Sequence, residues 1–230
     1  MNRGSEDSDP LKLPWYRAAF GGVGNQLSGD LLEIGCGRGE FAVWLAGVTP
    51  NVHVTAFDFS AAATIIAKER ALKAGQAVQL LSGDAQSLPF STDAFDWVVS
   101  CECMEHVPEP RAMDREIFRV LKPGGRFCFT TENYLNGLFI AWLRSWITGQ
   151  SFDSGSEVQP IENFFIFQQV QRYLKNAGLA VARTESSHYQ WLLLPGLDPG
   201  KPCTFELKSA LARCLAKPFG RHFSFFGYKP

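Results

Sequence analysis

The stretch LLEIGCGRG, residues 31–39, decides the fold of this chain. Its apolar first half is typical of a buried strand in a parallel sheet, and its second half has a glycine at every second position. Glycines let the backbone approach a ligand closely, and a helix that begins behind them offers unpaired N–H groups. A dinucleotide-binding loop would need a glycine at position 40, where this chain has Glu40. The stretch therefore predicts a nucleotide-type ligand, and Glu33 favours one that carries an amino group.

Strand-like and helix-like spacings of apolar residues alternate along the chain from residue 30 onward. We expect strands over residues 30–34, 52–57, 78–81, 95–101, 126–131, 179–184 and 222–229. We expect helices over residues 38–49, 60–75, 110–121, 167–178 and 206–216. This alternation predicts an α/β fold, a doubly wound and mostly parallel seven-stranded sheet with helices on both faces.

Three of the expected helices have recognisable faces or ends. The first carries an apolar face made of Phe41, Trp44, Leu45 and Val48. The second is alanine-rich, is capped by Ser60 and closed by Gly75, and carries Ile65, Ile66 and Leu72. The third begins at Pro110, and its apolar face consists of Met113, Ile117, Val120 and Leu121.

The length and composition indicate one globular domain over residues 1–230. Hydrophobic residues make up 46% and charged residues 20% of the chain, which is ordinary for a protein with a packed core. We expect residues 1–10 to be flexible and residues 133–165 to form an insertion that caps the substrate. The net charge of −1 argues against a nucleic-acid partner, because such binding depends on many contacts from Lys and Arg to phosphate.

The cellular location can be predicted from the cysteines and the N-terminus. The six cysteines form no C-x-x-C pair, so we expect reduced thiols. The first ten residues lack the basic and apolar regions of a signal peptide, and no apolar run could span a bilayer. These features predict a cytoplasmic protein. Residues 201–230 hold six basic residues and one acidic residue, which predicts a solvated helix face, with contact to an anionic lipid or phosphorylated acceptor as the alternative.

Further motifs follow the glycine loop in a fixed order. They are FDFS at residues 57–60, GDAQSLPF at 83–90, FDWVVSC at 95–101 and LKPGGR at 121–126. With the loop, they resemble the class I S-adenosylmethionine-dependent methyltransferases of the ubiquinone- and menaquinone-biosynthesis type, over residues 31–131. The resemblance implies the same fold and S-adenosylmethionine as the cofactor.

The resemblance also implies which residues contact the cofactor. These are Glu33, Gly35, Cys36, Gly37, Gly39, Asp58, Phe59, Asp84, Ala85 and Cys101. Asp58 would accept hydrogen bonds from the ribose hydroxyls, a role that suits an acceptor-only carboxylate. Asp84 would accept a hydrogen bond from the adenine amine.

The stretch ECMEHVP, residues 102–108, follows the expected fourth strand, where the transferred methyl group should project. His106 is the candidate catalytic base, since an unperturbed histidine pKa of about 6.5 suits proton removal at neutral pH. The alternative is that His106 only holds the loop or contacts the cofactor. Glu102, Glu105 and His106 resemble a stretch in ubiquinone-pathway O-methyltransferases, some of which use a divalent metal. Because Glu-His at this place is widespread in related enzymes without metal, we expect no metal site.

Aromatic residues give the best indication of the acceptor. They lie in residues 134–146, at Phe164, Phe165 and Phe167, and near the C-terminus at Phe223, Phe225 and Phe226. They favour a hydrophobic, aromatic or quinol-like small molecule that is methylated at oxygen, although packing of the insertion onto the sheet explains most of them equally well. The alternatives are transfer to nitrogen or carbon of a natural product or lipid-linked acceptor, a non-catalytic binding module, and a nicotinamide-dependent reductase.

Overall fold

The computed structural model describes residues 10–23, 26–133, 146–147, 149, 161, 163, 165–190, 204–205, 209, 211 and 220–230. The strands are β1 (Gly29–Ile34), β2 (Val52–Asp58), β3 (Val78–Ser82), β4 (Phe95–Cys101), β5 (Leu121–Glu132), β6 (Ala180–Gln190), β7 (Thr204–Phe205) and β8 (Gly220–Tyr228). The helices are α1 (Pro14–Val23), α2 (Glu40–Val48), α3 (Ala61–Lys73), α4 (Pro110–Val120) and α6 (Phe167–Asn176), with 3-10 turns η1 (Pro10–Lys12) and η3 (Met104–His106).

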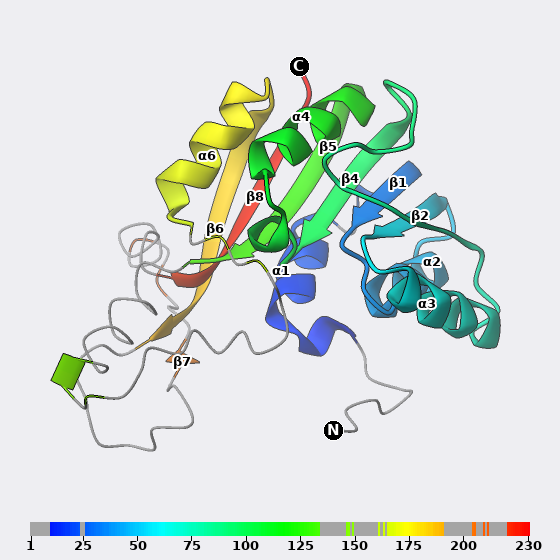
Figure 1. The fold of residues 1–230 in the computed structure, drawn as a ribbon, viewed down its shortest axis with the longest axis horizontal. Helices are drawn as coiled ribbons and strands as arrows, with labels where there is room; N and C mark the ends of the chain where they lie inside the picture. Colours follow the sequence, from blue (N-terminus) through cyan, green and yellow to red (C-terminus); the bar gives the residue numbers. More distant parts are fainter. Residues whose placement is uncertain are drawn as a thin grey trace.

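All the strands form one sheet in the order β3-β2-β1-β4-β5-β8-β6-β7 (Figure 1). The five strands from β3 to β5 are parallel, and β8 runs antiparallel to both β5 and β6. The predicted doubly wound, mostly parallel fold is therefore confirmed. The seven expected strands are all present, and the two-residue β7 is added at the edge.

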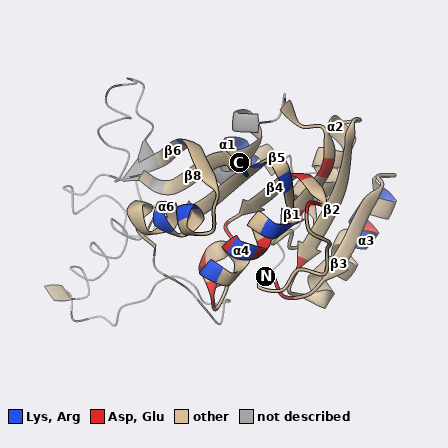
Figure 2. Cartoon of the chain, turned by 90° about the horizontal axis from the view of Figure 1, so that it is seen from above, with Lys and Arg blue, Asp and Glu red and all other residues tan. Residues whose placement is uncertain are grey.

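Helices cover both faces of the sheet, α4 and α6 on one face and α1 and α2 on the other (Figure 2). Each face has its own hydrophobic core. The predicted face of α4 is confirmed, because Met113, Ile117, Val120 and Leu121 are all fully buried. In α2, Phe41 and Leu45 are buried as expected, whereas Val48, the last residue of the helix, is 47% exposed.

Helix α3 begins and ends as the sequence indicates but buries a different face. Ser60 caps it by accepting a hydrogen bond from the amide of Ala63, and Gly75 follows its end with φ +64°. Its large apolar residues are exposed, with Leu72 at 73%, and the small residues Thr64, Ala67 and Ala71 are buried instead. The reason is close packing, since a Cβ on Gly39 would lie 2.7 Å from the Cβ of Ala67.

The region before residue 30 holds a helix that the sequence reading did not predict. Tyr16 of α1 stacks on Phe41 of α2 with ring centroids 4.6 Å apart. The spacing of Tyr16 and Phe20, four residues apart, was the available signal, because both pack into the same core. Helix α1 thereby packs against α2 and against strands β4, β5 and β8.

The chain after α4 runs directly into β5, which begins five residues earlier than expected. The backbone of Gly124 and Gly125 pairs with Lys229, through two hydrogen bonds of 2.8 Å. Lys229 is buried and forms an ion pair with Asp93 at 2.7 Å, so this basic residue does not belong to a solvated face.

Several expectations lie outside the described residues. They concern residues 1–9, which we expect to be flexible, most of the expected insertion over residues 133–165, and most of the expected helix over residues 206–216. Of the aromatic residues, Phe165, Phe223, Phe225 and Phe226 belong to the two cores, so packing accounts for them. Within the described part of the chain, no helix is both long and apolar enough to cross a membrane.

Candidate active site

The glycine loop lies at the carboxyl end of β1 and is held by β2. Gly35, Gly37 and Gly39 all have left-handed backbones, with φ of +81°, +53° and +77°. The amides of Gly35 and Cys36 donate to the carbonyl of Phe57 at 2.8 and 3.1 Å. A Cβ on Gly35 would lie 2.6 Å from the side chain of Cys103, whereas one on Gly37 would meet open space. The loop is therefore packed from below and open above Gly37.

Asp58 orients this loop from the end of β2. Its Oδ2 accepts a hydrogen bond of 2.7 Å from the amide of Gly37, and its Oδ1 accepts one of 2.8 Å from the amide of Ser60. A carboxylate has about four lone-pair sites, so it can still accept hydroxyl groups of a ligand. The next residue, Phe59, is 84% exposed and is free to pack against a flat ligand.

Glu33 lies buried beneath the loop. It shares the face of β1 with Leu31, which packs in the core under α1 and α2. Neither of its carboxylate oxygens has a hydrogen-bonding partner within the described residues. Burial, followed by the negative charges of Glu40 and Asp58, raises the pKa of Glu33 to about 8, although the nearby backbone amide of Ala42 lowers it. A buried carboxylate in this state is suited to a ligand that brings a positive charge.

Asp84 and Ala85 follow β3 and form the next part of the edge. Both carboxylate oxygens of Asp84 accept hydrogen bonds from the side-chain amide of Gln86, and Oδ1 also accepts one from the backbone N–H of Gln86. Gln86 in turn accepts a hydrogen bond of 2.9 Å from the amide of Glu109, just before α4. Asp84 is exposed and Ala85 is buried. The carboxylate is therefore positioned at the surface of the edge, within reach of a ligand.

Cys36 and Cys101, two of the expected cofactor contacts, have buried side chains. Burial raises the pKa of both thiols above their ordinary value. Both pack in the core under α1 and α2. A cofactor contact at these two positions would therefore be made through the backbone.

His106 ends the 3-10 turn η3, after β4. Its Nδ1 lies 3.0 Å from the carbonyl oxygen of Ile161. A carbonyl can only accept, so this contact places the proton on Nδ1 and leaves Nε2 as the basic nitrogen of the neutral ring. Beside it, Glu105 is buried and accepts a hydrogen bond of 2.9 Å from Thr131. Burial, and then the charge of Glu102, raises the pKa of Glu105 to about 8.

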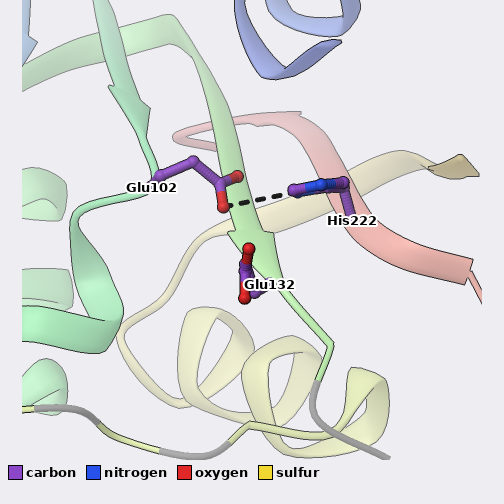
Figure 3. A group of neighbouring side chains, drawn as sticks. All are labelled: Glu102, Glu132 and His222. Atoms are coloured by element: carbon purple, nitrogen blue, oxygen red, sulfur yellow. Dashed lines mark ion pairs between the residues drawn. The ribbon is translucent and has the colours of Figure 1, made fainter. Parts of the chain in front are cut away.

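Glu102, Glu105 and His106 do not gather into one ligand set. Among the described residues, one group of three has ligand atoms within 4.8 Å of one another, and it consists of Glu102, Glu132 and His222 (Figure 3). Glu132 and His222 come from β5 and β8. The sequence reading missed both, because no local pattern shows which strand lies beside β5.

Comparisons with known proteins agree with this geometry. A methyltransferase domain family matches residues 32–129. A demethylmenaquinone methyltransferase from Listeria monocytogenes is 32% identical over 125 residues, which are 53% of this chain and 53% of that protein. A ubiquinone biosynthesis O-methyltransferase from Pseudomonas fluorescens is 33% identical over 128 residues, which are 55% of this chain and 53% of that protein. The match thus spans about half the length of both relatives.

A solved structure extends the likeness of the fold beyond that half. The S-adenosylmethionine-dependent methyltransferase from Thermotoga maritima superposes with a TM-score of 0.64 at 20% identity, over 94% of this chain and 89% of that chain. The residues present also fit S-adenosylmethionine, because the buried Glu33 suits its ammonium group and the loop is open above Gly37. Residues 32–129 therefore match a methyltransferase domain family, and the chain as a whole has the fold of the class I S-adenosylmethionine-dependent methyltransferases.

Proposed function

We propose that this chain transfers a methyl group from S-adenosylmethionine to an oxygen of a hydrophobic, aromatic or quinol-like small molecule. The observation that carries the proposal is the 3.0 Å contact between Nδ1 of His106 and the carbonyl oxygen of Ile161, which leaves Nε2 as the nitrogen that can accept a proton. A hydroxyl acceptor must lose its proton as its oxygen takes the methyl group, and an imidazole is the side chain best suited to that step at neutral pH.

The cofactor would be held by Glu33 at its ammonium group, by Asp58 at the ribose and by Asp84 at the adenine. Gly35, Gly37 and Gly39 keep the backbone close, and the start of α2 behind them offers its amides. When bound, S-adenosylmethionine supplies a methyl group on a sulfonium, which an acceptor takes up by direct displacement. The protein's contribution is then alignment and exclusion of water.

His106 would take the acceptor proton at Nε2. The ring becomes positively charged in that step, and the carbonyl of Ile161 already accepts the Nδ1 hydrogen and stabilises the charge. Glu105, the adjacent residue, lies close enough to His106 for the charge of the imidazolium to lower its pKa. The two relatives named for menaquinone and ubiquinone biosynthesis support a quinol-like acceptor.

The test is turnover with a panel of phenols and quinols, using methyl-labelled S-adenosylmethionine, for the wild type and His106→Asn. General bases typically contribute about 10²–10⁴-fold, so we expect kcat to fall by that factor in the variant. The affinity for S-adenosylhomocysteine, measured by calorimetry, should stay unchanged. His53→Asn is the matched control, because the His53 side chain is 87% exposed on β2, far from the turn η3.

Three outcomes would contradict the proposal. Methylation of amine or carbon acceptors alone would move the reaction away from oxygen. Binding of S-adenosylhomocysteine without turnover of any acceptor would favour a non-catalytic binding module. Binding of NADH in its place would mean that the glycine loop serves a nicotinamide-dependent reductase.

A further inference from the structure

Three ligand-type side chains meet at the carboxyl end of the sheet, outside the glycine loop. Glu102 follows β4, Glu132 ends β5 and His222 lies near the start of β8 (Figure 3). His222 is buried and the two glutamates are half-buried. Carboxylates and imidazole are the side chains that hold divalent metal ions in proteins.

Strand register brings two of the three together. Glu132 and His222 are direct partners in the antiparallel pair of β5 and β8. Residues opposite each other in such a pair point to the same face, with Cβ atoms about 4.5–5.5 Å apart. The side chain of Asn133 fastens this end of the pair, donating a hydrogen bond of 2.7 Å to the carbonyl of Gly220.

The third side chain is aimed at this pair by the loop after β4. The amide of Glu102 donates a hydrogen bond of 3.0 Å to the carbonyl of Thr130, two residues before Glu132. Its carboxylate Oε2 lies 3.4 Å from Nδ1 of His222. Two ligands about 2.1 Å from a tetrahedral ion lie about 3.4 Å apart, so these two atoms already have the spacing that a shared ion requires.

We propose that Glu102, Glu132 and His222 bind a divalent ion of the Mn²⁺ or Zn²⁺ type. Two carboxylates and one imidazole suit such ions, whereas Mg²⁺ favours oxygen ligands alone. Two negative charges in a half-buried site repel each other, and a shared cation lowers that cost. Three protein ligands leave coordination positions open for water or an acceptor.

The site differs from the one that the motif of Glu102, Glu105 and His106 suggests. Glu105 accepts a hydrogen bond from Thr131, whose strand partner Phe223 belongs to the core under α4 and α6. Glu132 is the next residue of β5 and therefore points to the opposite face of the sheet. Strand β5 thus separates Glu105 from Glu132 and from its strand partner His222.

Metal binding at this site does not depend on the proposed function, but a catalytic role for the bound ion rests on that function. A bound ion at this edge would lower the pKa of an acceptor hydroxyl and so assist the proton transfer to His106. A titration without any acceptor separates the two questions.

The experiment is a titration of chelator-treated protein with Mn²⁺, followed by the electron paramagnetic resonance signal of free Mn²⁺. Mn²⁺ is the probe because cysteine thiols compete for Zn²⁺ but not for Mn²⁺. Loss of a residue that only hydrogen-bonds to a metal ligand lowers metal affinity by roughly 10–100-fold, so loss of a ligand itself should lower it by at least about 100-fold. We expect that loss in Glu132→Gln, His222→Asn and Glu102→Gln.

The controls are chosen to locate the site. His53→Asn removes a histidine whose Nδ1 also lies 3.4 Å from a carboxylate, that of Asp30, but at an exposed pair. It should bind Mn²⁺ like the wild type, as should Glu105→Gln and His106→Asn. Unchanged affinity for S-adenosylhomocysteine shows that each variant is folded. If the wild type bound no Mn²⁺, Glu102 and His222 would form only an ion pair with each other. If Mn²⁺ binding were lost only in Glu105→Gln or His106→Asn, the ion would lie on the motif of Glu102, Glu105 and His106. Either result overturns the proposal.

Discussion

Glu33 and Glu105 are two buried glutamates on opposite faces of the sheet, and burial raises the pKa of each to about 8. Glu105 accepts a hydrogen bond from Thr131, so the fold itself supplies a partner for it. Glu33 has no hydrogen bond within the described residues and lies under the open glycine loop. A buried carboxylate without a partner lowers stability. We therefore expect Glu105 to stabilise the fold and Glu33 to bind a cationic ligand.

The largest expected effect is the loss of ligand affinity when one of the two glutamates is replaced by glutamine. A hydrogen bond to a charged group contributes about 1.5–3 kcal/mol, which corresponds to roughly 10–100-fold in a binding constant. Glu33→Gln should therefore weaken the binding of S-adenosylhomocysteine by that factor, because the ammonium group loses its charged partner. Glu105→Gln should change the affinity by less than about threefold. Calorimetric titration measures both, and equal losses in the two variants would end the distinction.

The next prediction concerns the pH dependence of stability. A carboxyl group whose pKa is higher in the folded state binds its proton more tightly there, so its contribution is fully present below the unfolded pKa, near 4.5. It is lost as the pH rises through about 8. Burial also raises the pKa of Asp114, to about 7. The free energy of unfolding should therefore fall between pH 5 and pH 8, by up to about 1.4 kcal/mol per pH unit for each group.

Urea unfolding at several pH values checks this slope. Glu33→Gln should flatten it and should make the ligand-free protein more stable at pH 8. Saturating S-adenosylhomocysteine should flatten the slope of the wild type in the same way, because its ammonium group compensates the charge of Glu33. A wild-type slope that ligand and variant both leave unchanged would show that Glu33 is not the titrating group.

The smallest expected effect comes from alanine substitutions at two glycines that share a left-handed backbone conformation. Gly37 and Gly124 both have positive φ, and a Cβ on either would meet nothing within 4 Å. Alanine at either position should cost about 1 kcal/mol of stability, since the left-handed conformation disfavours a side chain. Only Gly37→Ala should also weaken S-adenosylhomocysteine binding, because its methyl group enters the space above the loop. Thermal unfolding and calorimetry measure the two effects, and equal binding by both variants would mean that the ligand does not approach Gly37.

Much of the candidate cofactor site could be predicted, because its residues lie within a few positions of the carboxyl ends of the strands. Asp58 is the last residue of β2 and Asp84 lies two residues after the end of β3, and parallel strands bring their carboxyl ends to one edge. The exposed face of α3 could not be predicted, because Leu72 and Ala71 are equally compatible with a helix. The approach of Gly39 to Ala67 selects the small residues for the buried side.

The sequence by itself determined the strand, loop and helix around Glu33 and the alternation of strands and helices that gives a mostly parallel sheet. These features depend on local periodicity and on glycines at fixed positions, which each segment carries within itself. Only the tertiary structure decided that α1 packs against α2, that Glu105 meets Thr131, and that β8 sets His222 opposite Glu132. The physical reason is that strand register and burial arise from contacts between segments far apart in the chain, and no local pattern specifies them.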